Sequence, residues 1–141
     1  MADFTPLGLD HVVLRVKDQA ATQRFYIDVL GCTLELRQGT LAQLRAGSAL
    51  IDIVPADDEG PAKGTSSTGG ANLDHLCLRI EPFDPGALTA QLIRHGVMPG
   101  EIKSRYGADG YGPSVYISDP ESNTVELKGP PESRPAVDPQ K

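Results

Sequence analysis

The chain has 141 residues, 39% of them hydrophobic, and this length and composition predict one domain that can bury a core without disulfides. Its formal charge of −6 argues against a nucleic-acid binder, and no apolar run approaches the roughly 20 residues needed to span a bilayer. The N-terminus lacks a signal-peptide pattern and there are only two cysteines, so we expect a cytoplasmic protein with a small-molecule partner.

The first half of the chain predicts a strand, a helix and three further strands. Residues 9–16 alternate, with His11 and Arg15 on the face opposite three aliphatic side chains. Asp18 is suited to cap a helix that ends at Gly31. Strands are expected at 33–38, 41–46 and 48–54.

The second half repeats this order. Residues 73–80 (LDHLCLRI) repeat residues 9–16 (LDHVVLRV) at an offset of 75 − 11 = 64. Asp84 and Pro85 begin the second helix, which ends at Gly96 and places His95 in its last turn. Strands are expected at 99–104, 113–118 and 123–128, and the glycine-rich residues 107–112 predict either a hairpin connection or a loop that closes over a site.

These patterns predict an α+β fold of two tandem βαβββ modules within one domain. The modules span residues 7–55 and 73–128. Residues 56–72 form a linker rich in Gly, Ser and Thr, and residues 129–141 form a Pro-rich tail expected to be disordered. Neither segment is expected to carry chemistry.

Strand alternation predicts that polar side chains from both modules point away from the aliphatic faces. The residues concerned are His11, Asp52, His75, Tyr116 and Glu126. Two imidazoles with one or two carboxylates are typical ligands of a divalent transition metal. Matched histidines in both copies favour a ligand role, whereas Glu126 and Asp52 are also compatible with ordinary solvated strand positions.

Two further segments resemble the vicinal oxygen chelate superfamily, also called the glyoxalase, bleomycin-resistance and extradiol dioxygenase group. Residues 24–31 (RFYIDVLG) are similar to its helix end, and residues 114–126 (SVYISDPESNTVE) to its closing motif. The resemblance covers residues 7–128. It implies paired modules that form cupped, barrel-like sheets around a divalent metal (Zn, Ni, Mn or Fe(II)), commonly in a homodimer whose sites draw on both subunits.

The resemblance also implies roles for individual residues. His11, His75 and Glu126 match the metal ligands. Asp52 matches a fourth ligand, a Glu in glyoxalase I, but is one methylene shorter. Tyr116, at 126 − 10 = 116, matches a tyrosine shared by fosfomycin thiol transferases and extradiol dioxygenases. It is expected either to bind a substrate oxygen or to line the cup.

Several reactions remain open within the superfamily. A lactoylglutathione-lyase-like isomerisation needs a carboxylate base, for which Glu126 or Asp52 would serve. An extradiol dioxygenase usually needs a further histidine, and only His95 is left. A thiol transferase acting on fosfomycin needs cations for the phosphonate; the candidates, each also compatible with a solvated surface charge, are Arg15, Arg79, Lys103, Arg105 and Lys128.

A metal-free binding protein of the bleomycin-resistance type is the alternative from another class. Such proteins generally lack the metal-binding residues, so the presence of both histidines and Glu126 counts against it. We therefore expect a metal-dependent enzyme of glyoxalase type that acts on a small oxygenated substrate.

Overall fold

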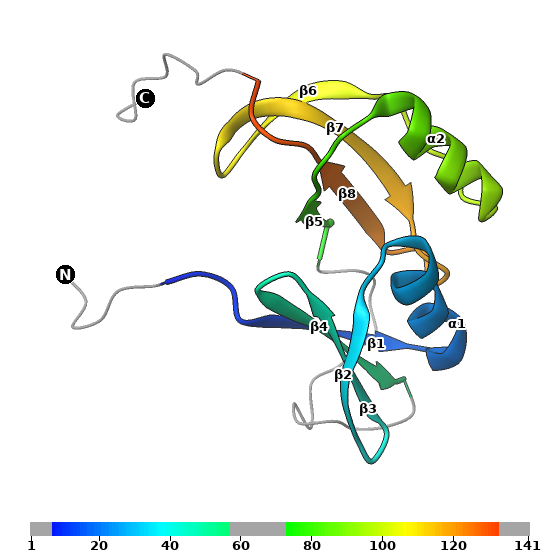
Figure 1. The fold of residues 1–141 in the computed structure, drawn as a ribbon. Coiled ribbons are helices and arrows are strands. Elements are labelled where there is room, and N and C mark those ends of the chain that lie inside the picture. The colour runs from blue at the N-terminus through cyan, green and yellow to red at the C-terminus, as the bar shows by residue number, and fades with distance from the viewer. Residues whose placement is uncertain (1–6, 57–72, 133–141) are drawn as a thin grey trace. The chain divides into compact units, whose positions relative to one another are not determined.

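The computed structural model describes residues 7–56 and 73–132. The chain divides into two compact units, with the boundary between residues 68 and 69, inside the predicted linker. Each unit contains one four-stranded sheet and one helical segment (Figure 1). The two units therefore correspond to the two predicted modules.

The first unit has the order strand, helix, three strands. Its elements are β1 (His11–Val16), α1 (Gln19–Arg24), the π-helical turn η1 (Phe25–Val29), β2 (Thr33–Gln38), β3 (Leu41–Ala46) and β4 (Ala49–Pro55). In the sheet, the strands lie in the order β1-β4-β3-β2, with β1 parallel to β4 and the other pairs antiparallel. The parallel pair brings the two ends of the module side by side.

The second unit has the same topology. Its elements are β5 (Leu76–Arg79), α2 (Pro85–Arg94), β6 (Lys103–Gly107), β7 (Gly110–Ser118) and β8 (Thr124–Lys128). The strand order is β5-β8-β7-β6, again with the first and last strands parallel. The predicted α+β fold of tandem βαβββ modules is confirmed.

Both helices begin as the sequence predicts. The side chain of Asp18 accepts a hydrogen bond from the Ala21 amide at 2.9 Å, and that of Asp84 accepts one from the Ala87 amide at 3.2 Å. Such caps contribute about 1 kcal/mol each. Gly31 then turns the chain from the first helical segment toward β2 with a φ of 80°, which a residue with a side chain adopts only at a cost.

Alternation along the strands separates core positions from site positions. Aliphatic side chains of both sheets are buried: Leu14, Val16, Leu44, Ile51 and Ile53 in the first unit, and Val115, Ile117, Val125 and Leu127 in the second. Each contributes roughly 1.5–3 kcal/mol through burial. Since neighbouring side chains in a strand face opposite sides, His11, Asp52 and Glu126 lie on the other face of their sheets.

The β6–β7 hairpin differs from the expectation. The predicted strand at 99–104 lies instead at Lys103–Gly107, and β7 begins at Gly110 rather than at residue 113. The glycine-rich segment is therefore the hairpin connection that one of the two interpretations predicted, and its turn consists of residues 108 and 109. It is not a long loop that closes over a site. Glycine favours loops locally, but here Gly107 and Gly112 lie in strands. A Cβ at Gly107 would lie 2.4 Å from Cε of Lys128, so that side chain would have to move, and one at Gly112 would lie 2.6 Å from the Pro130 carbonyl oxygen.

The linker and tail are described only in part. Of the linker, residues 57–72 lie outside the described residues, as do residues 133–141 of the tail. The first tail residues are ordered: the Gly129 amide donates to the Pro113 carbonyl and the Glu132 amide to the Tyr111 carbonyl, both at 2.8 Å. Within residues 7–56 and 73–132, no helix is long and apolar enough to cross a membrane.

Candidate metal centre

The second unit brings His75 and Glu126 together. Nε2 of His75 lies 3.2 Å from Oε1 of Glu126, and Nδ1 of the same ring lies 2.7 Å from the Asp74 carboxylate. Glu126 is 6% exposed, so it is not the solvated strand residue that the sequence also allowed. The contact with Asp74 fixes the orientation of the ring, so that Nε2 faces Glu126.

The first unit contains a similar arrangement around His11 and Asp52. Nδ1 of His11 lies 2.7 Å from the Asp10 carboxylate. This hydrogen bond, together with the nearby Asp52 charge, raises the pKa of the His11 imidazole. Asp52 is 3% exposed; its Oδ2 accepts from the Gln43 amide at 3.1 Å. Its buried Oδ1 has no hydrogen-bond partner among the described residues.

The two carboxylates occupy equivalent positions in the two sheets. Asp52 pairs in register with Val13, two residues after His11, and Glu126 pairs with Cys77, two residues after His75. Each module therefore holds one histidine, at or directly before the start of its first strand, and one buried carboxylate on the adjacent parallel strand. We call these two pairs the half-sets: His11 with Asp52, and His75 with Glu126.

The second half-set has the spacing that two ligands of one divalent metal require, whereas in the first His11 forms its ion pair with Asp10 and none with Asp52. Two ligands of one metal, with bonds of about 2.1 Å and angles of about 90–109°, lie about 3.0–3.4 Å apart. The 3.2 Å separation of Nε2 of His75 and Oε1 of Glu126 falls within that interval. Metal-binding histidines commonly donate their second ring nitrogen to a carboxylate, as both do here. The unpartnered Oδ1 of Asp52 is a donor atom that a cation would satisfy.

Each unit by itself contains two of the four predicted ligands. Among the residues that the structure describes, no group of three or more His, Cys, Asp and Glu side chains lies close enough to hold a metal ion. His95 is the C-cap of α2 and belongs to neither half-set.

Tyr116 lies beside His75. Their rings meet edge to face with centroids 5.4 Å apart, and the Arg105 guanidinium lies over the Tyr116 ring at 4.5 Å. Arg105 is fixed in turn by hydrogen bonds of 2.7 and 2.8 Å to the carbonyl and hydroxyl of Ser114. Tyr116 pairs in register with Glu126, as Gln43 does with Asp52. The structure thus places Tyr116 at the second half-set.

Sequence reasoning missed the residues that support the ligands. Asp10 and Asp74 were visible as the repeated Leu-Asp-His, but only the histidine was interpreted. The roles of Gln43 and Arg105 depend on pairing between strands and had no local signal.

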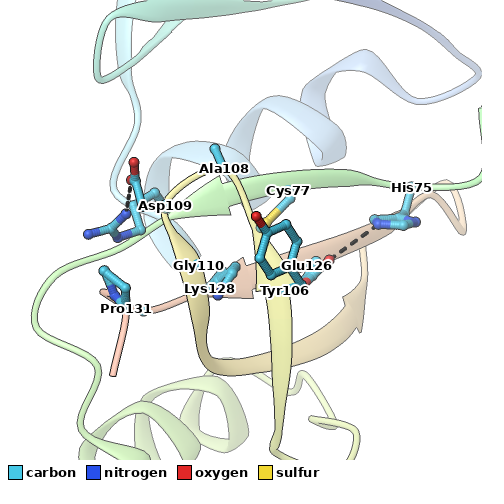
Figure 2. Close-up of a pocket in the computed structure, with 12 residues that line it drawn as sticks. His75, Cys77, Tyr106, Ala108, Asp109, Gly110, Glu126, Lys128 and Pro131 are labelled. Carbon is cyan, nitrogen blue, oxygen red and sulfur yellow. Dashed lines mark hydrogen bonds and ion pairs between the residues drawn. The ribbon is translucent and has the colours of Figure 1, made fainter. Parts of the chain in front are cut away.

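A cavity of about 350 Å³ opens beside the second half-set. Figure 2 shows His75, which contacts Glu126, toward one end and Asp109 toward the other. Asp109 forms an ion pair with Arg79. The lining residues are His75, Cys77, Arg79, Tyr106, Gly107, Ala108, Asp109, Gly110, Glu126, Lys128, Gly129 and Pro131. Desolvation and the Glu126 carboxylate raise the pKa of the Cys77 thiol to about 11, so it is a poor nucleophile at neutral pH.

Comparison with known proteins places these features in context. The sequence model of the Glyoxalase/Bleomycin resistance protein/Dioxygenase superfamily matches residues 8–127. A virulence protein of Salmonella typhimurium, STM3117, is 29% identical over 121 residues, which are 84% of this chain and 81% of that protein. Its crystal structure superposes with a TM-score of 0.79 at 27% identity and covers 90% of this chain and 99% of the other.

Two solved structures with assigned names have the same fold. The lactoylglutathione lyase of Agrobacterium tumefaciens has a TM-score of 0.64 at 21% identity, covering 88% of this chain and 94% of its own. The fosfomycin resistance protein FosX of Listeria monocytogenes has a TM-score of 0.66 at 20% identity, covering 89% and 94%. At these identities the similarity shows the fold alone.

Proposed function

Since this chain belongs to the Glyoxalase/Bleomycin resistance protein/Dioxygenase superfamily, we propose that it is a metal-dependent enzyme of glyoxalase type acting on a small oxygenated substrate. The observation that carries the proposal is the repeated half-set. In both modules a histidine is held at Nδ1 by the preceding aspartate, and a buried carboxylate lies at the same register position on the adjacent strand. Packing alone does not require this arrangement twice.

The four residues of the half-sets would hold the metal: His11, Asp52, His75 and Glu126. Zn, Ni, Mn and Fe(II) all accept such nitrogen and oxygen ligands. When bound, the metal supplies Lewis-acid stabilisation of negative charge on substrate oxygens. Asp10 and Asp74 keep the imidazoles oriented for this role.

The carboxylates and Tyr116 supply the remaining chemistry. In a glyoxalase-type isomerisation, Glu126 or Asp52 takes a proton from one substrate carbon and returns it to the adjacent carbon. The hydroxyl of Tyr116, beside His75, donates a hydrogen bond to a substrate oxygen. The buried position of both carboxylates excludes water that would compete for the proton.

We further propose that the active form is a cytoplasmic homodimer in which each metal site takes one half-set from each chain. This would complete the four-ligand set, since each unit by itself offers one histidine and one carboxylate. Mixing His11→Ala protein with Glu126→Ala protein tests it, because a mixed dimer would contain one site with both defects and one intact site. After subunit exchange in an equal mixture, half of the dimers are mixed and each has one intact site of two, so metal binding near a quarter of the wild-type level supports shared sites, whereas no recovery places the site within one chain.

The metal content of protein purified without chelators tests the proposed function. We expect bound metal in the wild type and in His95→Ala, the matched control for loss of a histidine, and near-zero metal in His11→Ala and Glu126→Ala. Near-zero metal in all four proteins would contradict the proposal and favour a metal-free binding protein.

Turnover assays identify the reaction. We expect isomerisation of the methylglyoxal–glutathione hemithioacetal to depend on the metal and on Glu126. Oxygen uptake with catechols and thiol consumption with fosfomycin are the corresponding assays for a dioxygenase and a transferase. Activity in either, without hemithioacetal turnover, would replace the isomerase assignment.

A further inference from the structure

Lys128 brings a buried positive charge into the cavity beside the second half-set. It lies two residues after Glu126 on β8 and is 7% exposed. Its side chain passes over glycine backbones: a Cβ built at Gly107 would lie 2.4 Å from Cε of Lys128, and one at Gly112 would lie 3.1 Å from Nζ. The glycines of the hairpin therefore leave open the space that the Lys128 side chain occupies.

The ammonium group of Lys128 is poorly compensated. Within residues 7–56 and 73–132 its hydrogen bond is to the Gly112 carbonyl, at a long 3.5 Å, and no carboxylate lies within ion-pair distance. Lysine is almost never fully buried without a partner, because removing an ammonium from water is costly. A ligand anion would supply that partner.

The other cation of the cavity is already neutralised. Arg79 is the cross-strand neighbour of Lys128. Its guanidinium donates to Asp109 at 2.5 Å and to Glu81 at 2.9 Å. Lys128 is therefore the cavity-lining cation whose charge remains available to a ligand.

We propose that Lys128 forms an anion subsite in this cavity, which binds a carboxylate, phosphate or phosphonate group of the substrate while the substrate's oxygenated end lies at His75 and Glu126. Two residues along a strand span about 7 Å, so the anionic group and the oxygenated end are separated by only a few bonds. That a substrate supplies the anion depends on the proposed function. The subsite itself does not require a metal.

Cys77 provides a metal-free test, because it lines the same cavity and Lys128 acts on its thiol electrostatically. The metal-free protein is alkylated with iodoacetate, an anion, and with iodoacetamide, its neutral analogue, and Cys77 is followed by peptide mass spectrometry. The ratio of the two rates removes any change in thiol reactivity that both reagents share. We expect Lys128→Gln to lower the iodoacetate-to-iodoacetamide ratio about tenfold, within the roughly 3- to 100-fold range for loss of one nearby charge.

Controls separate the charge of Lys128 from general effects. Lys128→Arg is expected to keep the ratio near that of the wild type, and Lys103→Gln, which removes an exposed lysine, is expected not to change it. An unchanged ratio in Lys128→Gln, or an equal fall in Lys103→Gln, would overturn the proposal. Buried Cys32 reports folding, since it becomes reactive only if a variant unfolds.

Protection of the wild-type protein is a second measurement that needs no variant. We expect inorganic phosphate, methylphosphonate or acetate to slow alkylation of Cys77 by iodoacetamide, and the most effective of them identifies the class of anion. Failure of all three would overturn the subsite. Because the metal is absent throughout, these results are independent of whether the proposed enzyme activity is found.

Discussion

Replacing Asp52 with Asn should stabilise the metal-free protein. Asp52 is 3% exposed, and its Oδ1 has no hydrogen-bond partner among the described residues. Leaving a buried polar atom unsatisfied costs about 1–3 kcal/mol, and more when the group is charged. Asn keeps the shape and can still accept from Gln43, so removal of the charge should increase the free energy of unfolding by about 1 kcal/mol.

The same substitution should reverse its effect when metal is present. At a metal concentration of about 100 times Kd, binding stabilises the wild type by about 2.7 kcal/mol. If loss of the carboxylate weakens binding about 100-fold, the gain in Asp52→Asn falls to about 0.4 kcal/mol. The variant would then be more stable than the wild type in chelator and less stable in metal.

Thermal unfolding with and without metal measures this reversal. A difference of 1 kcal/mol corresponds to a shift in Tm of about 3 °C for a chain of this size. Asp28→Asn, at an exposed position, is the matched control. It should change the Tm by no more than about 1 °C, both with and without metal. A lower Tm of Asp52→Asn in chelator, or equal stabilisation of both proteins by metal, would refute the assignment of Asp52 as a ligand.

Three further predictions concern other residues. Asp74→Ala should reduce metal affinity by about 10- to 100-fold in a metal titration, because His75 loses its orienting partner. The Tm in chelator should stay unchanged, since the Asp74 side chain is 96% exposed. An unchanged metal affinity would exclude the orienting role of Asp74. The rate of alkylation of Cys77 should increase about tenfold per pH unit up to about pH 10, because the pKa of its thiol is raised to about 11. Glu126→Gln should lower that pKa and speed the reaction at pH 8. A plateau of the rate near pH 8.5 would contradict this prediction. Asp119→Ala should lower the free energy of unfolding by about 3 kcal/mol in a denaturant titration, because the Asp119 carboxylate accepts three hydrogen bonds of 2.8–2.9 Å from the β7–β8 turn. A loss below about 1 kcal/mol would contradict this stabilising role.

Local patterns predicted most elements of the fold. The expected strands at 33–38 and 41–46 have the observed bounds, and both helices begin at the expected aspartates. These features depend on neighbouring residues: a two-residue period, a capping side chain and a glycine stop. The β6–β7 hairpin was placed less well, because Gly107 and Gly112 lie in strands, where they contact the distant residues Lys128 and Pro130, and not in a turn.

The equivalence of Asp52 and Glu126 was not visible in the sequence. Asp52 follows His11 by 52 − 11 = 41 residues, whereas Glu126 follows His75 by 126 − 75 = 51 residues, so a constant offset does not relate them. Only the parallel pairing of the first and last strand of each module aligns them. Burial of both carboxylates likewise depends on packing from distant parts of the chain.

X-ray absorption spectroscopy of the metal-loaded protein tests most directly the claim that the half-sets bind a metal. We predict a shell of nitrogen and oxygen ligands at about 2.0–2.2 Å with the scattering pattern of two imidazoles, reduced to one imidazole in His75→Ala if that variant still binds metal. His95→Ala should leave the spectrum unchanged. A sulfur ligand at about 2.3 Å, or the absence of imidazole scattering in the wild type, would contradict the account.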